Sequence, residues 1–250
     1  MSLLDLPIAA LAVIVLGMFS GSLVKGVLGA GIPAVGLPIM VMVIDPAQAV
    51  PLFLVPVALS NIWQIWEAGE MREALRRYWS FTLMLMICVW IGAGALVSVD
   101  PKLIALCVGI LVICTTLIQI FSPDVSEFLG RIRGLHPVAG GAIGLVAGVT
   151  GMFTPMIVYF AALRPPKDLF VTQMAIGAML GSIPLFVRLA VEGHLTWDQA
   201  EGSALALIPA AAGLAVGFWI RKRISETVFR HLVQAGLLAV SCGLIWRGLS

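Results

Sequence analysis

Long runs of apolar residues, separated by short polar stretches, dominate the pattern along the chain. A helix of about 20 apolar residues crosses the roughly 30 Å of membrane hydrocarbon. On that scale the pattern predicts six ordinary membrane-spanning helices, at residues 47–66, 79–99, 103–121, 169–190, 203–220 and 231–246. Charged residues, Pro or Gly bound these spans, and tryptophans fall at their ends, where an indole ring favours the headgroup level of the bilayer.

Two further apolar segments, residues 6–44 and 138–163, are each interrupted. The first contains GVLGAGIP from Gly26 to Pro33 and the second GVTGMFTP from Gly148 to Pro155, so Gly, Val, Gly and Pro recur 122 residues apart. Gly permits backbone conformations that other residues avoid, and Pro suits the first turn of a helix. Each motif therefore predicts that one helix ends and another begins inside the membrane.

The recurrence of this motif indicates an internal repeat. Other positions match with small gaps, namely Ser60 with Ser182, Gly69 with Gly193 and Gly92 with Gly213. We therefore expect an all-α polytopic membrane protein with a first repeat at residues 1–121, a cytoplasmic linker at 122–137 and a second repeat at 138–250. Each repeat holds one broken or re-entrant segment and three spans, which gives about eight membrane segments.

The positions of Lys and Arg predict that the two repeats are inverted. If each interrupted segment returns to its starting side, one face carries eleven basic residues: Arg72, Arg76, Arg77, Arg131, Arg133, Arg164, Lys167, Arg221, Lys222, Arg223 and Arg230. The other face then carries only Lys102 and Arg247, whereas single crossings would give seven against six. Cytoplasmic loops collect Lys and Arg, so the first arrangement is favoured and both termini are expected outside.

Composition excludes several classes of protein. Apolar residues make up 60% of the chain and charged residues 11%, and the formal charge of +2 suggests no basic face for nucleic acid. The four cysteines lie unpaired inside apolar spans, so we interpret them as buried packing residues and expect no metal and no cofactor. An enzyme is not expected either, because His136, His194 and His231 are isolated and no GxSxG or HExxH pattern occurs.

Polar side chains near the two breaks indicate an anion site. Helix N-termini at the breaks would present free N–H groups and the positive end of the helix dipole. Lys25 precedes the first break, and no Asp or Glu lies in the apolar part of a span, so a substrate anion is its candidate partner. Further donors near the breaks are Ser20, Ser22, Thr150 and Thr154, with the amides of Asn61 and Gln173 in the following spans.

Each of these features has a second interpretation. Lys25 can extend along its own helix to an interface. Arg188 is better explained by snorkelling or by an interfacial ion pair with Glu192 than by substrate binding. The Ser and Thr hydroxyls can bond back to helix carbonyls, and the glycines can serve close helix packing, as the series Gly140, Gly144 and Gly148 suggests.

The repeated Gly and Pro breaks, the turns at Gly69 and Gly193 and the glycine-containing spans resemble the sulfite exporter TauE/SafE family over nearly the whole chain. The resemblance implies a multi-pass permease of the bacterial cytoplasmic (inner) membrane that moves sulfite, an organosulfonate or a related sulfur-containing anion. It implies substrate-binding positions at Gly26, Gly29, Gly31, Pro33, Gly148, Gly151 and Pro155. To these we add, from the residues themselves, Lys25, Asn61, Thr150, Thr154 and Gln173.

The sequence therefore predicts a secondary transporter that works by alternating access around a midplane anion site between two broken helices. Its expected partners are the lipid bilayer and a small anionic substrate, and homo-oligomer formation stays open. Two alternatives remain at this point. Hairpins and helix dipoles also build passive anion channels, and a scaffold subunit of a membrane complex would carry no flux.

Overall fold

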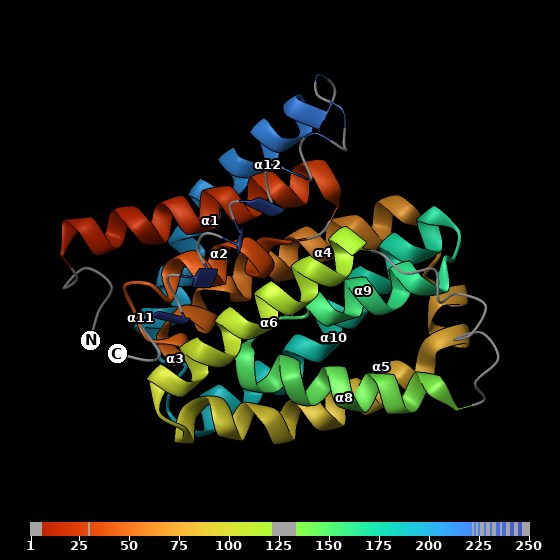
Figure 1. Cartoon of the computed structure of the whole chain (residues 1–250), viewed down its shortest axis with the longest axis horizontal. Helices are drawn as coiled ribbons and strands as arrows, with labels where there is room; N and C mark the ends of the chain where they lie inside the picture. Colours follow the sequence, from red (N-terminus) through yellow and green to blue (C-terminus); the bar gives the residue numbers. More distant parts are fainter. Residues whose placement is uncertain are drawn as a thin grey trace.

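Helices form the whole of the regular structure in the described part of the chain, which comprises residues 7–29, 31–121 and 134–221 and individual residues between 223 and 246 of a computed structural model (Figure 1). In chain order they are α1 (Ile8–Leu28), α2 (Ile32–Met40), α3 (Pro46–Ala49), the 3-10 helix η2 (Val50–Phe53), α4 (Leu54–Ala68), α5 (Met71–Ser98), α6 (Pro101–Phe121), α8 (Leu135–Thr150), α9 (Thr154–Leu163), α10 (Lys167–Val191), α11 (Trp197–Leu205) and α12 (Leu207–Arg221).

Within the described residues, six helical stretches are long and apolar enough to cross a membrane: Ile8–Leu28, Pro46–Ala68, Met71–Ser98, Pro101–Ile118, Asp168–Val191 and Trp197–Ile220. The last five match predicted spans, and the first is the apolar segment before the first break. The predicted span at 231–246 and most of the linker at 122–137 lie outside the continuously described residues. The prediction of a helical, multi-pass membrane protein is confirmed.

Both predicted breaks are present, and glycines with positive φ end the preceding helices. Gly29 (φ 83°) follows α1 and its N–H donates to the carbonyl of Lys25, while Gly151 (φ 71°) follows α8 and donates to that of Ala147. Only glycine adopts this left-handed conformation at little cost. The two short helices α2 and α9 then begin with a Pro in the first turn, where its missing N–H removes no helical hydrogen bond.

The span Pro46–Ala68 consists of three pieces, and a side chain from the second half repairs its backbone. Pro56 cannot donate to the carbonyl of Leu52, four residues earlier. The hydroxyl of Ser203 in α11 donates to that carbonyl at 3.0 Å and accepts from the N–H of Val55 at 2.9 Å. Unpaired backbone groups are costly in an apolar medium, so Ser203 holds α11 against the start of α4.

Glycines set the closest helix packing, and they do so in two similar pairs. Helix α5 lies along α8 and helix α1 along α12 (Figure 1). A side chain at Gly148 would lie 2.8 Å from the backbone of Gly92, and one at Gly26 would lie 2.9 Å from that of Gly217. Gly217, rather than the predicted Gly213, therefore occupies the packing position that corresponds to Gly92, and small residues allow this approach.

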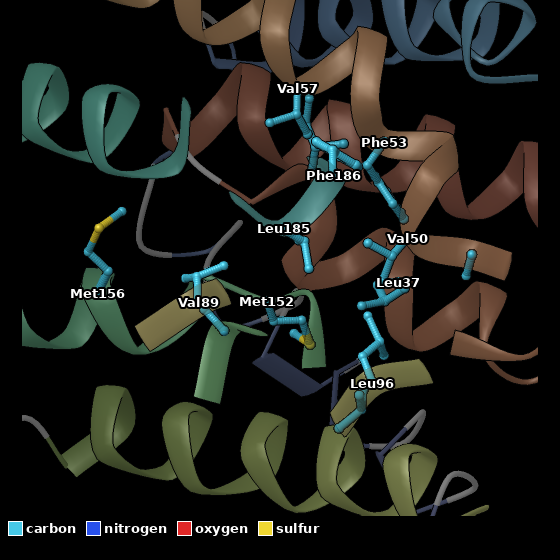
Figure 2. Packing of buried hydrophobic residues seen from close by; sticks show 14 of the residues in the cluster. Leu37, Val50, Phe53, Val57, Val89, Leu96, Met152, Met156, Leu185 and Phe186 are labelled. Atoms are coloured by element: carbon cyan, nitrogen blue, oxygen red, sulfur yellow. The ribbon is translucent and has the colours of Figure 1, made fainter. Parts of the chain in front are cut away.

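Between these pairs, α10 packs against α4 and α5, and the apolar core fills the space around the two breaks. Figure 2 labels ten of the core residues: Leu37, Val50, Phe53, Val57, Val89, Leu96, Met152, Met156, Leu185 and Phe186. They come from both halves of the chain, so the segments after the two breaks are packed into a common interior. The breaks are thus held in fixed positions by tertiary contacts.

Many side chains exposed on the helices are large and apolar, as expected for a protein in lipid. Large side chains such as Ile62, Ile91 and Ile208 are exposed on the helices, and so are the tryptophans near the span ends. One expectation is wrong: only Cys88 is buried, while Cys107, Cys114 and Cys242 are exposed. These three face outward because a thiol is compatible with an apolar solvent and needs no burial there.

Candidate functional site

The two helix starts that follow the breaks line one cavity of about 70 Å³, which we call the inner cavity. From the first half it receives Gly31, Ile32 and Pro33 at the start of α2. From the second half it receives residues around the start of α9, Gly151, Phe153, Thr154, Met156 and Ile157. The positive ends of two helix dipoles therefore adjoin the same cavity, and this favours a negative charge there.

Lys25, in the last turn of α1, brings a positive charge to the inner cavity. Its side chain is only 8% exposed, and its ammonium donates to Asn61 Oδ1 at 2.5 Å and to Ser60 Oγ at 3.1 Å. Both acceptors are neutral, and no carboxylate in the described residues forms an ion pair with it. An ammonium has three N–H donors, so one remains for a ligand. The burial disfavours the interpretation in which Lys25 extends to an interface.

Gln64 is a site residue that sequence reasoning missed. It lies on α4 three residues after Asn61, lines the inner cavity, and its amide donates to the carbonyl of Gly29 at the first break. A signal was available, because Asn61 and Gln64 share one face of a helix at i, i+3 spacing with Val57 one turn earlier. The carbonyl of Gly29, which the end of α1 leaves without a helical partner, is satisfied in this way.

Thr154 is the cavity residue with an unused hydroxyl. It is 8% exposed, begins α9 and lines the inner cavity, and its Oγ1 has no hydrogen-bond partner within the described residues. Buried hydroxyls are almost always paired, so an unpaired one beside a cavity indicates a ligand or water partner. Ser182, by contrast, lines the cavity but donates to the carbonyl of Ala178.

Five of the predicted site residues lie outside the inner cavity. Gly26 and Gly148 pack against α12 and α5, and Pro155 lies in the first turn of α9. Thr150 bonds back to the carbonyl of Val146 at 2.7 Å, which is the second interpretation given for the hydroxyls. Gln173 is 0% exposed and donates to Thr82 of α5 at 3.3 Å.

The other seven predicted residues all line the cavity: Lys25, Gly29, Gly31, Pro33, Asn61, Gly151 and Thr154. Of the remaining candidates, Ser22 is buried without a partner among the described residues, at the contact of α1 with Gly213. The breaks could be located from sequence because Gly and Pro act locally. Which face of α8 or α10 points inward depends on packing, so Thr150 and Gln173 could not be placed.

An outer cavity of about 890 Å³ meets the inner one at Lys25, Gly29 and Gln64, which line both. Its walls come from α1, α4, α12 and the start of α10, and they include Glu67 and Asp168. These two carboxylates lie in or beside the loops that carry the basic residues of the predicted cytoplasmic face. The outer cavity therefore connects the Lys25 region with that end of the molecule.

Arg188 lies apart from both cavities. Its guanidinium forms an ion pair with Glu192 at 2.6 Å and lies 5.4 Å from the ring centre of Trp90. The structure thus agrees with the interpretation of Arg188 as a partner of Glu192.

Comparison with known proteins gives one match. The model of the family described as sulfite exporter TauE/SafE matches residues 13–244 of the 250-residue chain. The searches of curated proteins and of solved structures found no match. The matched region includes both breaks, every residue of the inner cavity and both carboxylates of the outer cavity.

Proposed function

Because the chain belongs to the sulfite exporter TauE/SafE family, a family of membrane transporters, we propose that it is a secondary transporter for sulfite, an organosulfonate or a related small sulfur-containing anion. One observation carries the anion site: two helix starts, a buried ammonium and a hydroxyl with no partner among the described residues adjoin the same cavity. Positive ends of helices, and a lysine that has no carboxylate partner among the described residues, stabilise an anion in an apolar interior.

We place the substrate between two inverted repeats, each with one broken segment and three spans, which makes about eight membrane segments. The matching breaks and the similar glycine contacts of α1 with α12 and of α8 with α5 support this arrangement. The family match supports a bacterial cytoplasmic membrane, and the unequal distribution of Lys and Arg supports a position of both termini outside.

The proposed mechanism is alternating access, in which one repeat rocks against the other around a fixed site. The outer cavity supports it, because it gives Lys25 a route to the predicted cytoplasmic end while the inner cavity is buried among core residues. Closure of the outer cavity and opening on the opposite side would complete the cycle. The bond between Gln64 and the Gly29 carbonyl lies where the two cavities meet.

Lys25→Gln tests the site in liposomes that contain the purified protein. Glutamine keeps hydrogen-bond donors and removes the charge. We expect anion uptake at low substrate concentration to fall by at least about tenfold, since a charge-assisted hydrogen bond is worth about 1.5–3 kcal/mol and 1.4 kcal/mol is a factor of ten. Lys102→Gln removes an exposed lysine as the matched control and should transport as the parent does.

The flux measurements also separate the alternatives. A transporter shows saturating exchange that is stimulated by substrate on the far side. Current that rises in proportion to voltage without saturation would indicate a channel, and the absence of flux for sulfite, sulfonates, sulfate and carboxylates would indicate a scaffold subunit. Unchanged uptake by a well-folded Lys25→Gln protein would remove Lys25 from the site.

A further inference from the structure

Among the described residues that line the inner cavity, Lys25 is the only one with a charged side chain. The charged and amide side chains of the described lining come from the first half of the chain, whereas the second half contributes hydroxyls and apolar groups. In the first half, Lys25, Asn61 and Gln64 meet the cavity or its rim. The residues 122 positions later in the sequence are Ala147, Ile183 and Phe186. The second half therefore replaces the ammonium and both amides by apolar groups.

One positive charge compensates one negative charge. An anion with two negative charges would bring a second charge into the interior without a counter-ion, and desolvation of an unpaired charge is strongly unfavourable. The hydroxyl of Thr154 and the helix starts can bond to an oxygen, but they supply only partial charges. The charge inventory of the described residues thus favours a monoanion over a dianion.

Apart from the hydroxyls of Thr154 and Ser182, most of the cavity wall away from Lys25 is apolar. They include Phe53, Val57, Phe153, Ile157 and Phe186. Figure 2 shows Phe53, Val57 and Phe186 gathered together in the interior. An inorganic oxyanion presents polar oxygens on every side, and those that face these walls would lose their water without new hydrogen bonds. A substrate with a short apolar body would bury that body there, and burial of apolar surface is favourable.

The size of the inner cavity limits that body. A water molecule requires about 10–15 Å³ of such volume, so about 70 Å³ holds roughly five to seven waters. This corresponds to a compact head group with a short chain rather than a long alkyl tail.

We propose that the inner cavity selects an amphipathic monoanion, with one sulfonate-type head group at Lys25 and Thr154 and a short apolar body against Phe53, Phe153 and Phe186, and that it discriminates against dianions. This inference rests on the proposed function and narrows its substrate class.

Calorimetric titration of the purified full-length protein with matched anions tests the selectivity. Ethanesulfonate and 1-propanesulfonate carry one charge and an alkyl body, 1,2-ethanedisulfonate adds a second charge, and sulfate is a dianion without a body. We expect the two alkyl sulfonates to bind at least about tenfold more tightly than sulfate or the disulfonate. Equal or tighter binding of either dianion would overturn the inference and leave the proposed anion transport intact.

Other outcomes address the proposed function separately. Binding of none of these anions, together with absence of flux, would contradict the proposed function itself. Butanoate has one charge and a short body but no sulfur. If it binds as tightly as 1-propanesulfonate, the selection for an amphipathic monoanion is supported and the preference for a sulfur-containing head group is contradicted.

A gain of charge provides an independent test. Gln64→Lys places a second ammonium beside the cavity and keeps a donor for the Gly29 carbonyl. We expect the affinity for 1,2-ethanedisulfonate relative to ethanesulfonate to rise at least about tenfold. Gln48→Lys adds the same charge at an exposed position outside the cavity and should leave the ratio unchanged. If Gln64→Lys folds and the ratio stays the same, charge number does not determine selection.

Discussion

Two threonines, one on either side of the second break, differ in the hydrogen bonds that their hydroxyls make. The Thr150 hydroxyl donates to the carbonyl of Val146 and accepts from the N–H of Met152 at 3.3 Å, so it stabilises the end of α8. The Thr154 hydroxyl, four residues later, has no partner in the described residues and adjoins the cavity. The two hydroxyls therefore have different expected roles, one structural and one in substrate binding.

Valine substitutions distinguish these roles because valine keeps the shape and removes the hydroxyl. For Thr154→Val we expect the KM for the transported anion to rise by roughly two- to tenfold, since a neutral hydrogen bond contributes about 0.5–1.5 kcal/mol. For Thr150→Val we expect an unchanged KM. The free energy of unfolding should fall by about 0.5–1.5 kcal/mol, and the thermal transition should move to a lower temperature. Uptake kinetics and thermal melts of both proteins measure this, and the opposite pattern would reverse the assignment.

Sequence reasoning placed Lys25 and Asn61 near the first break because a charge and an amide are rare in apolar spans. It missed Gln64, whose contact with the Gly29 carbonyl joins residues 35 positions apart and depends on the packing of α4 against the break. Thr150 and Thr154 both flank a break in the sequence. Only the three-dimensional arrangement determines which hydroxyl faces the cavity.

At the level of elements, the breaks follow from local chemistry while the helix contacts follow from shape. Gly29 and Gly151 end their helices through positive φ, and this property can be predicted from a Gly and Pro pattern. Gly148 belongs to the same motif as Gly151 but has a different function, because it allows α8 to lie against the backbone of α5. The motif GVTGMFTP therefore contains one glycine that is needed for its backbone conformation, Gly151, and one that is needed for close packing, Gly148.

Alanine substitutions in α8 test the packing requirement. A side chain at Gly148 would meet backbone atoms of α5, whereas one at Gly141 would meet only the Cys88 sulfur at 3.4 Å and a flexible Met84 at 3.7 Å. We expect Gly148→Ala to lower the free energy of unfolding by about 1–3 kcal/mol, the range for overpacked interiors, and Gly141→Ala to have little effect. Thermal unfolding in detergent compares them. Equal stability of both proteins would show that α5 and α8 can separate at no cost.

For the whole molecule, the sequence indicated two related halves but not how they meet. The matching of Gly92 with Gly213 came from short similar strings. In the structure, Gly92 packs against Gly148 and Gly217 packs against Gly26, so Gly217 is the residue whose packing position corresponds to that of Gly92. A displacement of one helical turn leaves the apolar pattern almost unchanged, so periodicity alone does not determine it. The contact between Ser203 and the backbone of α4 was likewise outside the reach of sequence reasoning, because it joins residues about 150 positions apart.

Topology is the prediction that belongs to this scale. An odd number of crossings in each proposed repeat gives an even total, so we expect both termini on the same side of the membrane, and the Lys and Arg distribution predicts that this side is the outside. A reporter fused after Ser250 measures the position of the C-terminus. We expect a reporter that is active only in the periplasm to be active there and a cytoplasmic reporter to be silent. A cytoplasmic C-terminus would contradict the inverted arrangement.

The Lys25 ammonium at the meeting point of the two cavities also has an electrical consequence. In the proposed cycle, a bound monoanion neutralises Lys25, so the loaded carrier moves no net charge across the bilayer. An empty carrier in which Lys25 is protonated carries a positive charge during the return step. A membrane potential acts on a moving charge with about 2.3 kcal/mol per 100 mV for a full crossing, so voltage influences the return of the empty carrier and leaves one-for-one exchange unaffected.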